Sequence, residues 1–219
     1  MILSKKIAAA IKYNWFISFI IIGDRNVGKS TYALKALKYA FMLLGYTEKE
    51  SWIMALDCIK FTIPEVTEYL MDGVALYEDT HTKLPCLIWD DLRKYAGGIN
   101  FFLDKRLYSE ITGLLDTIKI PINVFIGTCP SMKGVMGVLQ DYDTYQINII
   151  HNARGRDYRT AKGFLWKTSP MGQRTLYPKF RDIFYCKLPN AIWTDYEQRR
   201  IEITKQSIRA VSEASSKKK

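Results

Sequence analysis

At residues 23 to 31 the sequence contains the loop Gly23-Asp24-Arg25-Asn26-Val27-Gly28-Lys29-Ser30-Thr31, which matches the pattern GxxxxGK[ST]. An apolar run from Trp15 to Ile22 precedes this loop, and a helical pattern from Tyr32 to Leu44 follows it. Its glycines let the backbone turn tightly and direct consecutive N–H groups toward one anion. The N-terminus of the following helix adds partial positive charge at the same place. A strand, a glycine loop and a helix in this order predict a phosphate-binding P-loop.

The chemistry expected of this loop is nucleotide binding. All nine residues, from Gly23 to Thr31, would surround the phosphates of ATP. Lys29 would reach the β- and γ-phosphates, and the hydroxyl of Ser30 would ligate Mg²⁺. The alternative is an ordinary glycine turn with an incidental lysine, which the complete spacing in this setting disfavours.

A second motif is Cys86-Leu87-Ile88-Trp89-Asp90-Asp91, four apolar residues that end in two carboxylates. A short apolar run of this kind predicts a strand buried in a parallel sheet, with its acidic end at the edge where ligands bind. This is the Walker B pattern: Asp90 would hold the Mg²⁺, and Asp91 would orient or deprotonate the attacking water. Many ATPases have Glu at the second position, so Asp91 departs from the common pattern.

A polar residue also ends the apolar run Ile122 to Gly127. Thr128 follows this run directly and is the candidate to contact the γ-phosphate or the water, with Ser131 as its substitute. The alternative is that Thr128 only caps the strand.

The remaining patterns predict an α/β fold. Ser51 to Cys58 favours a buried strand and Tyr145 to His151 a fifth strand. Helices are expected over four other segments: a helix from Glu65 with Thr62 as N-cap, Asp104 to Lys119, Ser131 to Gln140, and Trp193 to Ala214. We therefore expect a mostly parallel five-stranded core sheet flanked by helices, followed by a β-rich extension and a terminal helix.

Positive charge is concentrated at the C-terminal end of the 219-residue chain, whose net charge is +10. Residues 1–153 contain 16 Lys and Arg and 16 Asp and Glu, whereas residues 154–219 contain 16 and 6. We expect residues 1–153 to form the nucleotide-binding core and residues 154–219 a basic extension of the same compact unit. Aromatic residues are interspersed among these cations, a mixture that suits contact with DNA through phosphates and stacked bases. The alternative is a small sheet with aromatic core residues and a solvated basic face.

Together these motifs resemble the additional-strand class of P-loop ATPases, which includes the RecA-like and AAA+ families. The resemblance covers about residues 14–153. It implies an extra strand between the P-loop strand and the Walker B strand, and ATP hydrolysis completed by a neighbouring subunit in a ring or filament. The short core with its Trp-Asp-Asp motif and basic extension is also similar to small ATPases of archaeal viruses and plasmids.

Beyond the fifth strand the chain departs from AAA+ proteins, because added strands replace a helical lid. In RecA-like rings a basic pair near this point acts across the subunit interface, and Arg154 and Arg156 are the residues in that position. The alternative is a basic turn that contacts solvent or nucleic acid, and Arg93 is a further candidate.

The hypothesis from the sequence is a magnesium-dependent ATPase that acts on DNA in replication initiation, helicase loading or genome packaging. The alternatives are a nucleotide or nucleoside kinase and a nucleotide-switched interaction protein. Four dispersed cysteines indicate a reducing compartment, and no apolar run reaches the ~20 residues needed to span a bilayer. We therefore expect a cytoplasmic protein without membrane insertion.

Overall fold

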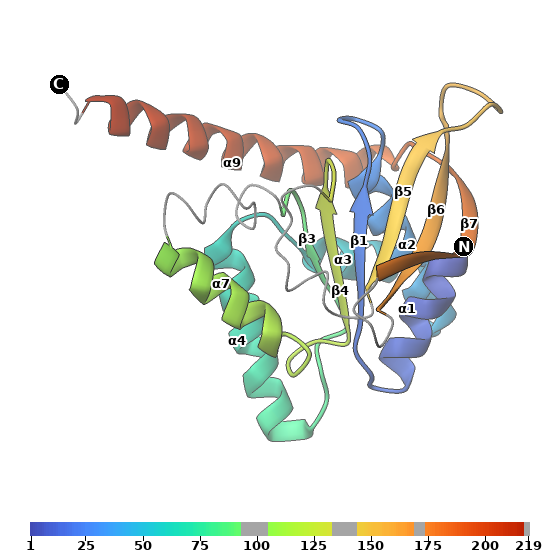
Figure 1. Cartoon of the computed structure of the whole chain (residues 1–219), viewed down its shortest axis with the longest axis horizontal. Helices are drawn as coiled ribbons and strands as arrows, with labels where there is room; N and C mark the ends of the chain where they lie inside the picture. The colour runs from blue at the N-terminus through green and yellow to red at the C-terminus, as the bar shows by residue number, and fades with distance from the viewer. Residues whose placement is uncertain (93–104, 133–143, 169–173, 217–219) are drawn as a thin grey trace. The chain divides into compact units, whose positions relative to one another are not determined.

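The computed structural model describes residues 1–92, 105–132, 144–168 and 174–216 (Figure 1). The chain divides into two compact units, Met1–Lys187 and Leu188–Lys219. The smaller unit contains helix α9 (Asn190–Ser216), in agreement with the expected terminal helix. The functional boundary that we expected after residue 153 stays a prediction.

The larger unit is built on a seven-stranded sheet in the order β2-β3-β4-β1-β5-β6-β7. The first five strands in this order are mutually parallel, and β6 and β7 are antiparallel additions at one edge. The strands are β1 (Ile17–Ile22), β2 (Ile59–Lys60), β3 (Leu87–Trp89), β4 (Val124–Cys129), β5 (Tyr145–His151), β6 (Tyr158–Thr168) and β7 (Arg174–Tyr185). The mostly parallel five-stranded core and its β-rich extension are therefore confirmed, and β4 lies between β1 and β3 as the resemblance implied.

Helices cover both faces of the parallel core. They are α1 (Ile2–Lys12), α2 (Lys29–Leu43), α3 (Glu48–Asp57), α4 (Ile63–Thr80) and α7 (Lys105–Thr117). In Figure 1, α1 and α2 lie on one side of the sheet, and α4 and α7 lie on the other. Val66 of α4 and Ile111 of α7 pack with Trp89 and Phe125 of the sheet in one buried cluster. This double cover explains why β3 and β4 are continuous apolar runs rather than alternating ones.

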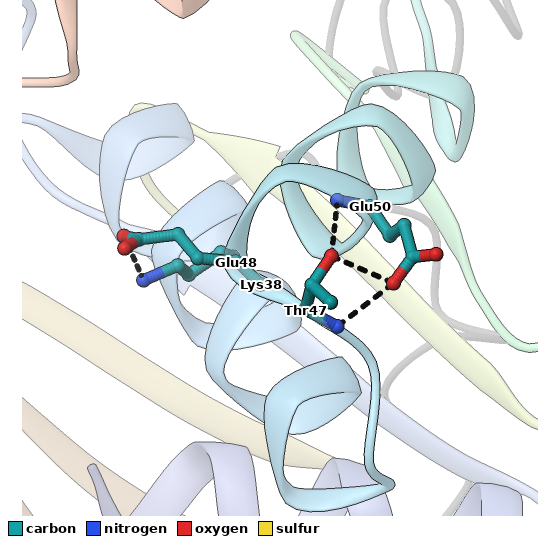
Figure 2. A network of polar contacts seen from close by, with 4 residues as sticks. All are labelled: Lys38, Thr47, Glu48 and Glu50. Atoms are coloured by element: carbon teal, nitrogen blue, oxygen red, sulfur yellow. Dashed lines mark hydrogen bonds and ion pairs between the residues drawn. The ribbon is translucent and has the colours of Figure 1, made fainter.

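The expected strand from Ser51 to Cys58 is wrong, because these residues belong mainly to helix α3. Thr47 caps this helix: its hydroxyl accepts the Glu50 N–H at 3.3 Å, and the Glu50 carboxylate accepts the Thr47 N–H at 2.9 Å (Figure 2). Lys38 of α2 adds an ion pair of 2.6 Å to Glu48. The capping box and the helical spacing of buried residues outweigh the apolar composition of the segment. The second core strand is instead the short β2 that follows.

Strand β7, the second added strand, is part of the core packing. Asp182 of β7 is buried and accepts the N–H groups of Ile2 at 2.8 Å and Leu3 at 3.2 Å, at the start of α1. It also accepts the hydroxyl of Tyr32 on α2 at 2.8 Å. Burial and the nearby Asp182 carboxylate raise the pKa of Tyr32 far above its ordinary value. One carboxylate therefore joins β7 to two helices of the core.

The other expected helices are confirmed where the structure describes them, as α4, α7 and α9. The Thr62 N-cap is confirmed, with its hydroxyl accepting the Glu65 N–H at 3.4 Å. Most of the helix expected over Ser131 to Gln140 lies outside the described residues, as does Arg93. Within residues 1–92, 105–132, 144–168 and 174–216, no helix combines the length and apolar character needed to cross a bilayer.

Candidate nucleotide-binding site

The glycine loop connects the end of β1 to the start of α2, as the sequence predicted. Gly28 is the N-cap of α2 and has a left-handed backbone with φ of 98°. A Cβ at Gly23 would lie 2.7 Å from the Ile149 carbonyl oxygen, and one at Gly28 would collide with the Cys186 sulfur. Both glycines are therefore required by close packing against the neighbouring strands as well as by the turn. Because α2 begins directly after Gly28, the first N–H groups of the helix are directed to the loop, where a phosphate would bind.

Lys29 points back over the loop. Its Nζ donates to the carbonyl oxygens of Gly23 at 2.9 Å and Asp24 at 2.8 Å. Desolvation lowers the pKa of Lys29, while the carboxylates of Asp91 and Asp90 act in the opposite direction. The loop thus holds a half-buried ammonium group among acceptors that the phosphates of a nucleotide are able to replace.

Ser30 and Asp90 meet at the carboxyl edge of the sheet. The Ser30 Oγ donates to Asp90 Oδ1 at 2.7 Å. Asp90 follows β3 directly and is only 2% exposed. The two motifs predicted to share a Mg²⁺ ion are therefore in direct contact.

Thr128 joins the second motif to β4. Its Oγ1 donates to Asp90 Oδ1 at 2.6 Å and accepts the backbone N–H of Asp91 at 3.0 Å. Asp91 itself is exposed and has a left-handed backbone, with φ of 54°. Such a conformation costs free energy for a residue other than glycine and is held here by the contact with Thr128. Thr128 thereby fixes the direction in which the chain leaves β3.

The donor atoms at this edge suit a magnesium ion. Mg²⁺ prefers oxygen ligands and is commonly bound through one or two carboxylates together with phosphates of the substrate. The Ser30 hydroxyl and the Asp90 carboxylate are oxygen donors already within hydrogen-bonding distance of each other. These two residues would hold the ion beside a bound triphosphate.

The other residues of the loop differ in their exposure to solvent. Asp24, Arg25 and Asn26 are exposed, whereas Val27 and Thr31 are buried. The structure thus leaves the middle of the loop accessible and anchors its second half.

Arg154 and Arg156 occupy the turn between β5 and β6, and both are exposed. The structure does not bring them into the hydrogen-bonded group of Ser30, Asp90, Thr128 and Asp91. Their role across a subunit interface stays a prediction.

Two residues behind the loop were missed in the sequence. The buried Arg159 of β6 donates from Nε to the Val27 carbonyl at 3.1 Å, and from Nη1 to the carbonyls of Arg156 at 2.5 Å and Tyr158 at 2.9 Å. The Cys186 thiol lies 3.8 Å from the same Val27 oxygen. The added strands therefore support the loop from behind. The only signal in the sequence was the position of Arg159 in a basic stretch, which gave no indication of its partner.

The strand order, the loop and the paired motifs together make this a P-loop NTPase fold. No protein-family model matches the chain. The uncharacterized protein B-251 of Sulfolobus spindle-shape virus 1 is 29% identical over 212 residues, which cover 90% of this chain and 79% of that protein.

Solved structures that are similar to this chain include the following two. The N-terminal domain of zonular occludens toxin from Neisseria meningitidis has a TM-score of 0.45 and 13% identity, over 82% of this chain and 98% of that one. The cytoplasmic domain of the type VII secretion ATPase EccC from Thermomonospora curvata has a TM-score of 0.38 and 11% identity, over 76% of this chain and 24% of that one.

Proposed function

We propose that the protein is a magnesium-dependent ATPase of the RecA/AAA+ type that acts on DNA. The observation that carries this proposal is the hydrogen bond of 2.7 Å between Ser30 and Asp90, which places a P-loop hydroxyl on a Walker B carboxylate. Mg²⁺ bound there would neutralise charge that develops on the transferred phosphoryl group.

The other site residues would bind the phosphates and activate the attacking water. Lys29 leaves the carbonyls of Gly23 and Asp24 to bind the β- and γ-phosphates. Asp91 accepts a proton from, or orients, the attacking water, and Thr128 keeps both carboxylates at the edge of the sheet. The N–H groups at the start of α2 bind phosphate oxygens.

The position of β4 between β1 and β3 supports the additional-strand class over GTPases. In that class Arg154 or Arg156 would reach the γ-phosphate of a neighbouring subunit in a ring or filament. Both side chains are exposed and therefore accessible to a second copy of the chain.

Action on DNA is supported by the uneven charge. The 16 Lys and Arg among residues 154–219, against 6 Asp and Glu, would attract a polyanion. The 29% identical relative comes from a virus, which agrees with a viral or plasmid setting for this protein. In that setting the roles that we propose are replication initiation, helicase loading or genome packaging.

The test is the rate of ATP hydrolysis without DNA, with single-stranded DNA and with duplex DNA. We expect magnesium-dependent turnover that DNA stimulates. Phosphate transfer to a nucleoside or nucleotide would favour the kinase alternative, and tight nucleotide binding with negligible turnover would favour the interaction protein. Turnover that DNA leaves unchanged, with no DNA binding at low salt, would contradict the DNA part alone.

A further inference from the structure

The β6–β7 hairpin and the turn before it carry an excess of positive charge. Residues 154–187 include nine Lys and Arg but only two Asp. Asp157 forms an ion pair of 2.8 Å with Lys187, and Asp182 is buried against Tyr32 and the start of α1. Neither carboxylate therefore offsets the other cations at the surface. Where the structure describes side-chain exposure in this segment, the exposed cations are Arg154, Arg156, Lys162, Lys167, Lys179, Arg181 and Lys187.

Strand β7 alternates between a buried and an exposed side, and on the exposed side of β6 Thr160, which lies opposite Ile183, is buried between the exposed Tyr158 and Lys162. Along β7, Phe180, Asp182 and Phe184 are buried, whereas Arg181, Ile183 and Tyr185 are exposed. Lys162 lies directly opposite Arg181, and Tyr158 lies directly opposite Tyr185. Residues that are directly opposite in an antiparallel pair point to the same side of the sheet. We call the side formed by Tyr158, Lys162, Arg181, Ile183 and Tyr185 the outer face.

We propose that the outer face of the β6–β7 hairpin binds single-stranded nucleic acid, with Lys162 and Arg181 on phosphates and Tyr158 and Tyr185 against bases. The inference rests on the proposed action on DNA and assigns that action to a surface. Non-specific sites for single strands combine cations that follow the backbone with aromatic rings on which bases stack. The outer face has both, next to each other.

Both tyrosine rings are partly exposed to solvent, and the ammonium groups of Lys35 and Lys187 lie 5.5 and 5.8 Å from the centroid of the Tyr185 ring. Tyr158 is 40% exposed and Tyr185 is 42% exposed, and their ring centroids lie 5.5 Å apart. From Arg181 to Tyr185 a strand extends over about 13 Å, several times the ~3.4 Å between stacked bases. The outer face therefore has room for more than one nucleotide between the cation pair and the tyrosine pair.

Unpaired nucleic acid fits these features better than a duplex or a protein strand. In a duplex the base faces are already stacked, so exposed tyrosines would gain nothing from it beyond contact with its edges. A protein strand would add along β7, which is the last strand of the sheet. The bulge between Gly163 and Phe164 and the cations along this edge disfavour such pairing.

The experiment measures binding of a fluorescent thymine oligonucleotide and of a matched duplex by anisotropy over a range of salt concentrations. Two double variants are compared with the wild type: Lys162→Ala with Arg181→Ala, and Tyr158→Leu with Tyr185→Leu. A matched control is Lys5→Ala with Lys49→Ala, which removes the same charge from exposed positions on α1 and α3. Thermal unfolding and ATP hydrolysis without DNA are recorded for every variant.

We expect the wild type to prefer the single strand. The cation variant should bind it roughly tenfold more weakly, with a slope of log K against log salt that is shallower by about 1.4, since each lost phosphate contact contributes about 0.7. The tyrosine variant should also lose roughly tenfold in affinity, but with an unchanged salt slope. The control should stay close to the wild type in affinity.

The outcomes separate this inference from the proposed function. Wild-type affinity in both double variants would overturn the outer face as the site while leaving DNA binding intact. Equal loss in the control would mean that net charge alone governs binding, and would overturn it as well. A wild type that binds neither the single strand nor the duplex at low salt but hydrolyses ATP would refute DNA binding and leave the ATPase in place. A preference for duplex that the tyrosine variant does not alter would also contradict the inference.

Discussion

Ser30 and Asp90 are separated by 59 intervening residues in the sequence and joined by a hydrogen bond of 2.7 Å in the structure. Ser30 belongs to the helix that follows β1, and Asp90 directly follows β3. These strands do not touch, because β4 lies between them and supplies Thr128 to the same carboxylate. The site is therefore assembled from three parallel strands whose carboxyl ends share one edge of the sheet.

Replacing Asp90 by Asn tests the metal site. The amide retains the shape of the side chain but loses the negative charge that would hold Mg²⁺. We expect turnover at saturating ATP to fall by about a hundredfold, the size of the effect when one group that stabilises the charge of a transition state is removed. In a magnesium titration, the variant should need a higher Mg²⁺ concentration than the wild type for half-maximal turnover. Asp72→Asn, an exposed position on α4, is the control and should behave like the wild type. Equal magnesium dependence in both variants would contradict the assignment.

Replacing Arg159 by Gln tests the support of the loop by β6. Three backbone carbonyls would lose a charged donor, which costs on the order of 1–3 kcal/mol of stability for buried groups. One of these carbonyls belongs to Val27 of the glycine loop, so the loss should disturb the loop. We therefore expect the KM for ATP to rise about tenfold while kcat changes less. Arg159→Lys keeps the charge and should restore part of the affinity. A lower Tm with an unaltered KM would mean that Arg159 has only a structural role.

Replacing Arg154 by Ala tests the contact between subunits. The exposed side chain should be dispensable for nucleotide binding and required for turnover in an assembled ring or filament. We expect activity to fall and to return in mixtures with Asp90→Asn, since each variant supplies what the other lacks. Mixtures no more active than the sum of their parts would remove Arg154 as the residue that acts in trans. The same mixture with Arg156→Ala distinguishes the two arginines.

The ionisation of Lys29 predicts how nucleotide affinity varies with pH. Burial lowers the pKa of Lys29 in the folded chain below 10.5, the value for a free lysine. Between the lowered pKa and 10.5, the unfolded chain therefore binds more protons than the folded chain. Without nucleotide, the free energy of unfolding should therefore rise with pH in that window as far as Lys29 is concerned. Bound phosphates favour the charged lysine, so affinity should fall as pH rises through the lowered pKa. Binding of Mg-ADP, measured by calorimetry in alkaline buffers, should show this fall. Lys29→Arg stays charged and should bind with little change over the same range.

The local chemistry of the site was predictable from the sequence. The two motifs at residues 23–31 and 86–91 each lie within a few consecutive positions, and the strands that present them are apolar runs. The place of β4 between β1 and β3 was implied by the resemblance to additional-strand ATPases. The contact of Thr128 with Asp90 does not follow from the local sequence, because it depends on which strand lies beside β3.

What the sequence could not supply depends on distant partners or on competition between local signals. Ser51 to Cys58 is apolar enough for a strand, and the capping box of Thr47 and Glu50 decides for a helix. Arg159 looks like any cation of a basic stretch, and its burial follows from a pairing with β7 and a carbonyl 132 residues away. The role of such residues can be inferred only when the arrangement of the strands is known.

The most direct measurement of the central claim is ATP hydrolysis by the wild type and by Lys29→Ala, with thermal unfolding recorded for both. If the loop binds a triphosphate, we expect magnesium-dependent turnover in the wild type, a loss of at least about a hundredfold in the variant, and the same Tm within the range typical of a surface substitution. Equal turnover in a folded Lys29→Ala protein would contradict it, because the loop would then play no part in binding a triphosphate.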